Sequence, residues 1–244
     1  MPYIRERCVA GNTIEVRKYF SPRIGVKGEI RMKRVKPTPE SVKKANIRKA
    51  ERELRQLMNA NFDKRSWSLT LTFSQAPSLE ELQKEVARYT RRLRSIAKKK
   101  KTEVKYIYVF GIGKKARHIH MIVSGLTAEE LSEAWTAGHV NQTKIYSENL
   151  RDLANYFMKN AENSRKRLIE AGLKPGRRYN GSRNLKKPKV THRVIKANIY
   201  RTEIKEPKGY YLDKDSVYQG ISGFTGLPVF EYTFLKLEGT EGCG

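Results

Sequence analysis

The chain has 244 residues, and its 51 Lys and Arg against 25 Asp and Glu give a formal net charge of +26 at pH 7. Its 38% of hydrophobic residues suffice for a packed core, which excludes a wholly disordered chain, and no apolar stretch approaches the ~18 residues of a membrane span. Two cysteines are too few for a disulfide framework or a zinc cage, so we expect a protein of a reducing cytoplasm whose partners are polyanions.

The N-terminal part of the chain is expected to be a basic arm followed by a helix. Residues 1–37 contain scattered glycines and prolines and are predicted to be irregular. Thr38 is placed to cap a helix that begins at Pro39 and that we expect to run to Met58.

The central part of the chain alternates between strand and helix patterns. Apolar and hydroxyl side chains alternate from Trp67 to Phe73, which predicts a half-buried strand. A capping box of Ser78 with Glu81 then begins an amphipathic helix that ends in a lysine run.

A predicted hairpin follows, with strands over residues 104–110 and 118–123. Thr127 with Glu130 is a second capping box, which opens a short helix through Trp135. A short strand is expected over residues 140–146, and Ser147 is placed to cap a long helix that includes Leu168.

This order of strand, helix, strand, strand, helix, strand predicts an α+β fold of the ferredoxin-like, split βαβ type, which is also RRM-like. We expect the helices to cover one face of an antiparallel sheet and the other face to be open to a ligand. Three parts are predicted: a basic arm and helix over residues 1–61, the sheet domain over 62–170, and a basic segment with C-terminal strands over 171–244.

The segment after the sheet domain is strongly basic. Residues 171–202 contain ten Lys or Arg and no acidic residue, so we expect this segment to contact nucleic acid and to become ordered around it. Weak alternation from Ile204 to Leu237 predicts additional strands. The sequence contains no Walker-type phosphate loop, so any ATP-driven motor would be a different protein.

Two histidines form the most informative local pattern. His118 and His120 are two residues apart on a predicted strand, so their side chains lie on the same face of the sheet, which we expect to be the open face. Neutral imidazoles side by side are good ligands for a divalent metal ion. Two such histidines also occur in ordinary packed strands, so the pattern alone leaves both interpretations open.

Tyr156 and Lys159 form a second pair, three residues apart on one face of the long helix. A tyrosine can act as a covalent nucleophile, and a lysine beside it can hold a phosphate. Thr70 and Thr72 are expected on the same sheet face as the histidines. A surface aromatic with a solvated lysine, and an ordinary amphipathic strand, are the alternative interpretations of these two patterns.

In their order and spacing, three segments together resemble the motifs of the HUH endonuclease superfamily, specifically of its rolling-circle replication initiators: Leu69 to Phe73, His118-Ile119-His120, and Tyr156 to Lys159. The chain is similar to the single-tyrosine replication-associated proteins of bacterial plasmids, phages and other mobile elements. Three more segments resemble that group: Met1-Pro2-Tyr3-Ile4, Lys36-Pro37-Thr38-Pro39, and Ser182 to Pro188.

The resemblance implies a metal-dependent nickase and strand transferase that acts on single-stranded or hairpin origin DNA. His118 and His120 would hold Mg²⁺ or Mn²⁺, and Tyr156 would attack the scissile phosphate to leave a 5′-phosphotyrosine and a free 3′-hydroxyl. Lys159 would neutralise charge on that phosphate. A helicase and a polymerase of the bacterial host are the implied protein partners.

The sequence departs from the family pattern at one position. Relatives usually carry a carboxylate on the strand before the histidines, whereas the matching position near Gly111 has no acid. Because Mg²⁺ prefers oxygen ligands, a third ligand is expected from elsewhere in the chain or from water. The predicted DNA contacts are Thr70, Thr72, Arg117, Arg177, Arg178, Arg183, Lys186 and Lys187.

Two other functions also fit the sequence. A transposase or a plasmid-mobilising relaxase of the same superfamily would use the same chemistry. A non-catalytic, RRM-like binder of single-stranded nucleic acid is the other, because Tyr106, Tyr108 and Phe110 alternate on one strand and could stack on unpaired bases. That interpretation requires the three aromatic rings to face away from the helices.

Overall fold

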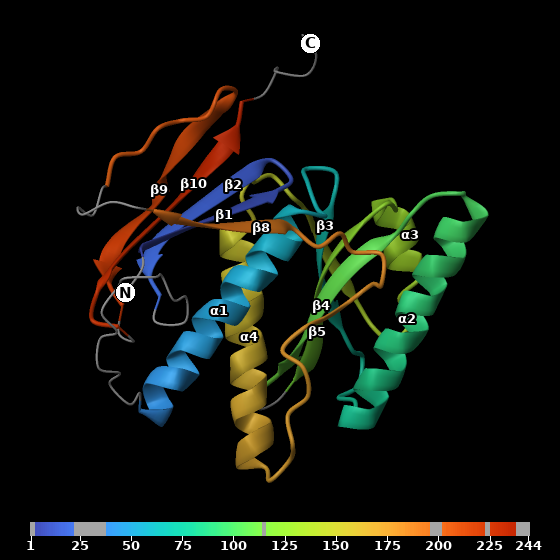
Figure 1. The fold of residues 1–244 in the computed structure, drawn as a ribbon. Coiled ribbons are helices and arrows are strands. Elements are labelled where there is room, and N and C mark those ends of the chain that lie inside the picture. Colours follow the sequence, from blue (N-terminus) through green and yellow to red (C-terminus); the bar gives the residue numbers. More distant parts are fainter. Residues whose placement is uncertain (1–2, 22–37, 114–115, 196–201, 223–224, 238–244) are drawn as a thin grey trace. The chain divides into compact units, whose positions relative to one another are not determined.

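The computed structural model describes residues 3–21, 38–113, 116–195, 202–222 and 225–237. Within these residues the chain forms four helices and two antiparallel five-stranded sheets (Figure 1), which confirms the α+β class. Met1, Pro2, the pair Lys36-Pro37 and Cys243 lie outside the described residues. Among the helices described, none has the length and apolar character to cross a membrane.

The chain divides into two compact units. One is continuous in sequence, Asn61–Lys186, and is called the central unit below. The other combines the two ends of the chain, Met1–Ala60 and Lys187–Gly244, and is called the terminal unit.

The central unit contains the elements predicted for the sheet domain. They are β3 (Trp67–Thr72), α2 (Leu79–Lys99), β4 (Lys105–Ile112), β5 (Arg117–Ser124), α3 (Ala128–Glu133), β6 (Val140–Lys144), α4 (Arg151–Glu170) and the short β7 (Asn180–Gly181). The sheet has the strand order β6-β3-β5-β4-β7, so the hairpin strand β5 lies between β3 and β4.

Local capping interactions explain where most of these helices begin. The Ser78 and Thr127 capping boxes are both present, with side-chain and backbone bonds to Glu81 and Glu130 respectively. The cap predicted at Ser147 is wrong, because its hydroxyl bonds to Asn149 in a turn and α4 begins after Leu150 without a side-chain cap.

Helices cover both faces of the central sheet. The face with Leu69, Leu71 and Ile119 packs on α2 and α3 in one hydrophobic core. Helix α4 lies across the opposite face, where the ring of Phe157 is fully buried and its centroid is 6.2 Å from that of His120. The prediction that all helices lie on one face is therefore wrong, because the sheet is apolar on its second face as well and α4 has an apolar stripe to bury against it.

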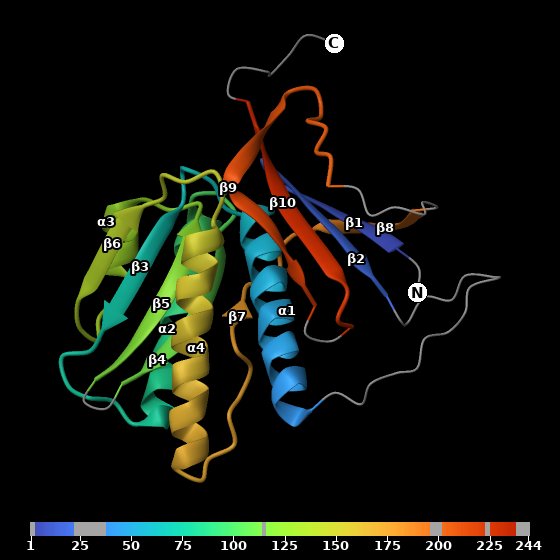
Figure 2. The same cartoon turned by 90° about the vertical axis from the view of Figure 1, so that its left-hand side faces the viewer.

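The terminal unit is a second antiparallel sheet with one helix. Its elements are β1 (Tyr3–Ala10), β2 (Thr13–Phe20), α1 (Pro39–Asn59), β8 (Lys189–Ile195), β9 (Tyr210–Ile221) and β10 (Pro228–Lys236). Figure 2 shows β10 between β9 and β2, and the complete order is β8-β1-β2-β10-β9. Helix α1 begins at Pro39 with Thr38 as its N-cap, as predicted.

Two expectations for this unit are corrected. Residues 3–20, expected to be irregular, form the hairpin of β1 and β2, and residues 189–195, expected to need nucleic acid for order, pair with β1 as strand β8. The strands predicted after Ile204 are present as β9 and β10.

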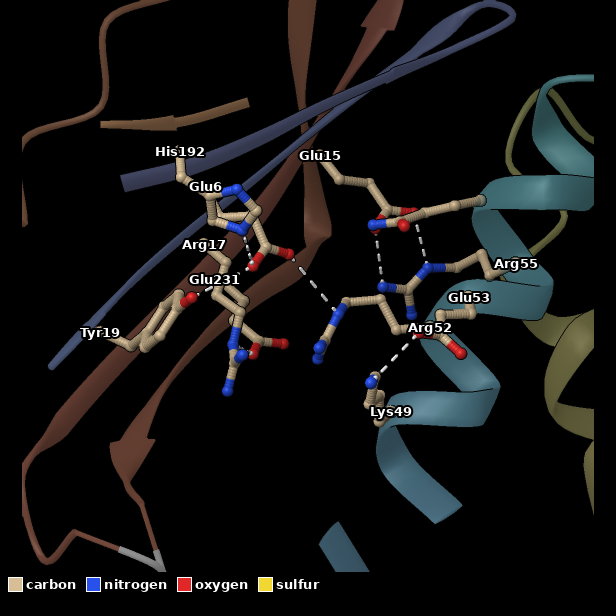
Figure 3. Close-up of polar contacts among 11 residues, drawn as sticks. Glu6, Glu15, Arg17, Tyr19, Lys49, Arg52, Glu53, Arg55, His192 and Glu231 are labelled. Carbon is tan, nitrogen blue, oxygen red and sulfur yellow. Dashed lines mark hydrogen bonds and ion pairs between the residues drawn. The ribbon is translucent and has the colours of Figure 1, made fainter. Parts of the chain in front are cut away.

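Ion pairs attach α1 to one face of the terminal sheet (Figure 3). Arg55 donates to both carboxylate oxygens of Glu15, at 2.7 and 3.0 Å, and Gln56 donates a third bond to the same group. Arg52 lies 3.8 Å from Glu6, and Arg17 donates to Glu231 across the neighbouring strands at 2.6 Å. These contacts satisfy the polar groups that the helix buries against the sheet.

The pair of Arg55 and Glu15 tests this attachment. Arg55→Met should lower the free energy of unfolding by about 3–5 kcal/mol, because it leaves the Glu15 carboxylate buried without its cation. Lys44→Met is the matched control: Lys44 pairs with Glu40 on the exposed side of the same helix, so the loss should be about 0.5 kcal/mol or less. Urea unfolding followed by circular dichroism measures both, and equal losses would contradict the prediction.

Candidate active site

Strand β5 brings the two histidines to the sheet face that α4 covers. His118 pairs with Thr72 on β3 and with Gly111 on β4, whereas His120 pairs with Thr70 and Val109. Their neighbours Ile119 and Met121 point into the core against α2. The two imidazole rings lie edge to face, with centroids 4.6 Å apart, so the sequence-based placement of the histidines side by side on one face is observed.

His120 is the centre of a hydrogen-bonded group. Its Nδ1 is 3.1 Å from the Thr70 hydroxyl, and its Nε2 is 3.1 Å from the Tyr156 hydroxyl. The imidazole of His120 is 3% exposed, whereas Tyr156 is 48% exposed. The structure thus brings a solvent-accessible tyrosine on α4 to the inner histidine of the pair.

Both imidazoles are neutral at physiological pH. Burial lowers the pKa of His120 from 6.5 to about 4, and the neighbouring His118 adds to the effect while the Asn160 side chain partly opposes it. Burial also lowers the pKa of His118. Neutral imidazole is the form that binds a metal ion or accepts a hydrogen bond from a hydroxyl.

Gly111 makes room for the outer histidine. A Cβ atom at this position would lie less than 3.0 Å from three atoms of the His118 ring, Nε2 among them. The ring therefore occupies the space that any side chain at position 111 would fill. Related proteins are expected to carry a carboxylate at this position. Here a carboxylate side chain would collide with the His118 ring in its present position.

The other residues predicted for the site are divided between the two faces. Thr72 is on the histidine face and donates to the backbone oxygen of His139 at 3.1 Å. Lys159 is exposed on α4, three residues after Tyr156. Arg117 faces away from the histidines and donates to the backbone oxygen of Pro77, so the structure does not bring it to the site.

The predicted DNA-contacting residues after α4 lie in separate places. Arg177 and Arg178 line a cavity of about 510 Å³ between α2, β4 and α4, and Arg178 pairs with Glu162. Arg183 and Lys186 are exposed, and no described contact joins them to the histidines. Lys187 is exposed and belongs to the terminal unit.

Asn160 is a site residue that the sequence analysis did not identify. Its side chain lies beside His120, and its amide nitrogen donates to the backbone oxygen of Tyr156 at 2.9 Å. Its position four residues after Tyr156, on the same side of a helix, is the signal that could have identified it.

The aromatic residues of β4 do not form an open platform. Tyr106 is 7% exposed, and Tyr108 and Phe110 pack with it against the core that contains α2. The RRM-like interpretation requires these rings to face away from the helices, so the sheet lacks the surface on which that interpretation would stack bases.

The residues present could hold a divalent metal ion only in part. His118 and His120 offer two neutral nitrogen ligands, but no cluster of three His, Cys, Asp or Glu side chains exists among the described residues. The remaining ligands would therefore be oxygens of bound phosphate, of water or of a side-chain amide such as that of Asn160.

Comparison with known proteins identifies the central part of the chain. Residues 66–165 match the sequence model of the family Replication-associated protein ORF2/G2P. The match begins next to β3 and ends within α4, so it includes both histidines, Tyr156 and Lys159. No curated protein and no solved structure matches the chain.

This match confirms the resemblance to replication-associated proteins inferred from the motifs. The match supports a role in DNA replication, in the setting of mobile elements or phages, and therefore DNA as a ligand.

Gly111→Ala tests the coupling between position 111 and His118. The added methyl group should displace the His118 ring and lower the free energy of unfolding by about 1–3 kcal/mol, as expected for overpacking. Gly176→Ala is the control, because nothing lies within 4 Å of a Cβ built there. Imidazole resonances in NMR spectra report the ring, and an unchanged His118 signal in Gly111→Ala would contradict the prediction.

Proposed function

We propose that the protein is a rolling-circle replication initiator of the HUH endonuclease superfamily, which nicks single-stranded origin DNA through Tyr156 and later rejoins the strands. The observation that carries the proposal is the pairing of an accessible Tyr156 hydroxyl with Nε2 of a neutral, buried His120 at 3.1 Å. Both residues lie in the segment that matches the replication-associated family.

We include the ferredoxin-like arrangement of the central unit in this proposal. The order β6-β3-β5-β4, antiparallel throughout, leaves β3 and β4 separated by β5 and joined in sequence through α2. That is the pattern of a split βαβ unit. It supports the superfamily assignment because it brings the motif strands β3 and β5 together at the sheet centre.

The proposed reaction is a transesterification at phosphorus. The Tyr156 oxygen forms a bond to the scissile phosphate, the bond from phosphorus to the 3′-oxygen breaks, and that oxygen takes up a proton to become a 3′-hydroxyl. In the metal-free site the Tyr156 proton can pass to His120 Nε2, provided that Nδ1–H donates to the Thr70 hydroxyl. When Nε2 binds a metal ion, the proton passes to water instead. The reverse attack by a 3′-hydroxyl on the phosphotyrosine rejoins DNA.

The exposed Lys159 ammonium would then neutralise charge on the phosphate, since it follows Tyr156 by three residues on α4. We further propose that His118 and His120 bind Mg²⁺ or Mn²⁺, which supplies Lewis-acid polarisation of the phosphate. The Nε2 lone pair of His120 can serve the Tyr156 hydroxyl or a cation, but not both at once.

The basic residues outside the site are proposed to hold DNA. Exposed guanidinium and ammonium groups contact phosphates without regard to base sequence. In the central unit the exposed ones are Arg177, Arg183 and Lys186, followed in sequence by Lys187 of the terminal unit. Arg178 is half-buried and pairs with Glu162. The 3′-hydroxyl product implies a host polymerase, and unwinding ahead of it implies a separate helicase.

Tyr156→Phe tests the nucleophile. The wild-type chain, incubated with Mn²⁺ and an end-labelled single-stranded origin oligonucleotide, should give an adduct that survives denaturing electrophoresis, and Tyr156→Phe should give none because it lacks the attacking oxygen. Tyr146→Phe is the control, since Tyr146 is 78% exposed on a different segment. An adduct that persists in Tyr156→Phe would disprove the assignment, and the sequence of the attached DNA separates an origin from a transposon end or a transfer origin.

Metal binding gives an independent test, read as the rise in melting temperature on adding Mn²⁺. His118→Ala should abolish the rise, because it removes one of two nitrogen ligands. Tyr156→Phe should strengthen Mn²⁺ binding by up to about fivefold, because it frees His120 Nε2 from a hydrogen bond worth about 1 kcal/mol. Exposed His139→Ala is the control. An undiminished response in His118→Ala would rule out the proposed metal site.

A further inference from the structure

The two faces of the terminal sheet carry opposite arrangements of charge. Among the paired positions of its described strands, every acidic side chain lies on the face that α1 covers: Glu6, Glu15, Asp213 and Glu231. On that face Glu6, Glu15 and Glu231 meet Arg17, Arg52, Arg55 and His192, as Figure 3 shows. The charges of this face are therefore compensated within the unit.

The opposite face is basic where β8, β1 and β2 lie side by side. The register places Arg193 next to Arg5, and Arg5 next to Lys18, in one row across the three strands. Arg7 lies two positions further along β1 and pairs with Thr191 on β8. Lys189 lies two positions from Thr191 on β8, on the same face. We call Arg5, Arg7, Lys189 and Arg193 the basic face.

No acid compensates the basic face among the described residues. None of its four side chains forms an ion pair with another described residue, and Arg5, Lys189 and Arg193 are exposed. Glu203 contacts Lys18 through its backbone oxygen, while its carboxylate pairs with Lys205. Burial and then the charge of Arg5 lower the pKa of Lys18, and the charge of Glu203 partly opposes them.

Like charges directly opposite each other on neighbouring strands reduce the stability of a sheet. The high net charge of the chain does not account for this placement, because the same three strands carry compensated ions on their other face. A bound polyanion would remove the repulsion. Given the proposed function, the available polyanion is DNA.

The aromatic residues of this unit indicate which form of DNA fits. On the basic side of the sheet Tyr3, Phe230 and Tyr232 are buried, at 3–6% exposure. The exposed Tyr211 and Tyr218 pair with Leu235 and Glu231 and so lie on the other face. The two other described rings on this side, Phe20 and Tyr210, are half-buried. Among the described residues the basic face therefore offers phosphate contacts but none of the fully exposed rings on which unpaired bases stack in surfaces that bind single strands.

We propose that the basic face binds the sugar-phosphate backbone of double-stranded DNA. It is a second DNA site, distinct from the one around Tyr156, and it holds duplex independently of base sequence. It rests on the proposed function only for the choice of DNA as the ligand.

The test compares Arg5→Gln/Arg193→Gln with Lys43→Gln/Arg48→Gln in the full chain. Both variants lose two exposed cations from the terminal unit, but the second loses them from α1. The probes are a short fluorescent duplex of arbitrary sequence and one of its strands, titrated by anisotropy over a range of salt concentrations.

Arg5→Gln/Arg193→Gln should weaken duplex binding at least about tenfold at roughly 0.1 M salt, and reduce the slope of log affinity against log salt by about 1.8. The control should change both much less. The melting temperature of Arg5→Gln/Arg193→Gln should stay the same or rise, because the substitution removes repulsion.

Equal losses in the two variants would mean that net charge alone is responsible and would overturn the proposal. So would unchanged duplex binding, or an equal loss for the single strand. Failure of the proposed function is distinguishable, because Tyr156→Phe should lose the covalent adduct and keep duplex affinity, whereas Arg5→Gln/Arg193→Gln should keep the adduct.

Discussion

The register of β5 between β3 and β4 is the constraint on which the candidate site depends. Side chains alternate along a strand, so a slip by one residue would turn both histidines into the core under α2 and bring Ile119 to their place. The apolar residues on both faces hold the register. The Thr70 partner of His120, and the glycine beneath His118, follow directly from it.

Helix α4 connects this strand to the proposed nucleophile. Phe157 is fully buried against the sheet, and the residue before it is turned by about 100° around the helix. That rotation places Tyr156 at the border of the buried stripe, where its hydroxyl reaches His120 while its ring remains accessible. The same packing that stabilises the helix therefore positions the hydroxyl, and the bond from Ser164 to Phe110 anchors the helix further along.

Charge is arranged differently in the two units. In the terminal unit, acidic and basic side chains form ion pairs where α1 packs on the sheet. On the other face, the charged side chains described on β8 and β1 are all basic. In the central unit, the strands that carry the histidines and threonines contain one charged residue, Arg117, and most lysines and arginines lie on helices and on the segment after α4. The excess of positive charge therefore lies on separate basic surfaces of each unit, and the strands of the candidate site contribute little to it.

The sequence by itself determined the features that depend on near neighbours. The caps at Thr38, Ser78 and Thr127, the alternation of β3 and the spacing of His118 and His120 are interactions within a few residues, and all were predicted. The cap at Ser147 was not, because a competing turn to Asn149 uses the same hydroxyl.

Only the tertiary structure decided what depends on distant partners. Strands β1 and β2 contain charged residues, and their sequence alone does not show how these charges are paired in a sheet. Arg17, for example, pairs with Glu231, which is 214 residues away in sequence. The face chosen by α4, the contact of Tyr156 with His120, and the His118 ring over Gly111 likewise join segments far apart in sequence. The physical reason is that apolar faces are buried against partners that fit them in shape and register. A local sequence pattern contains no information about that fit.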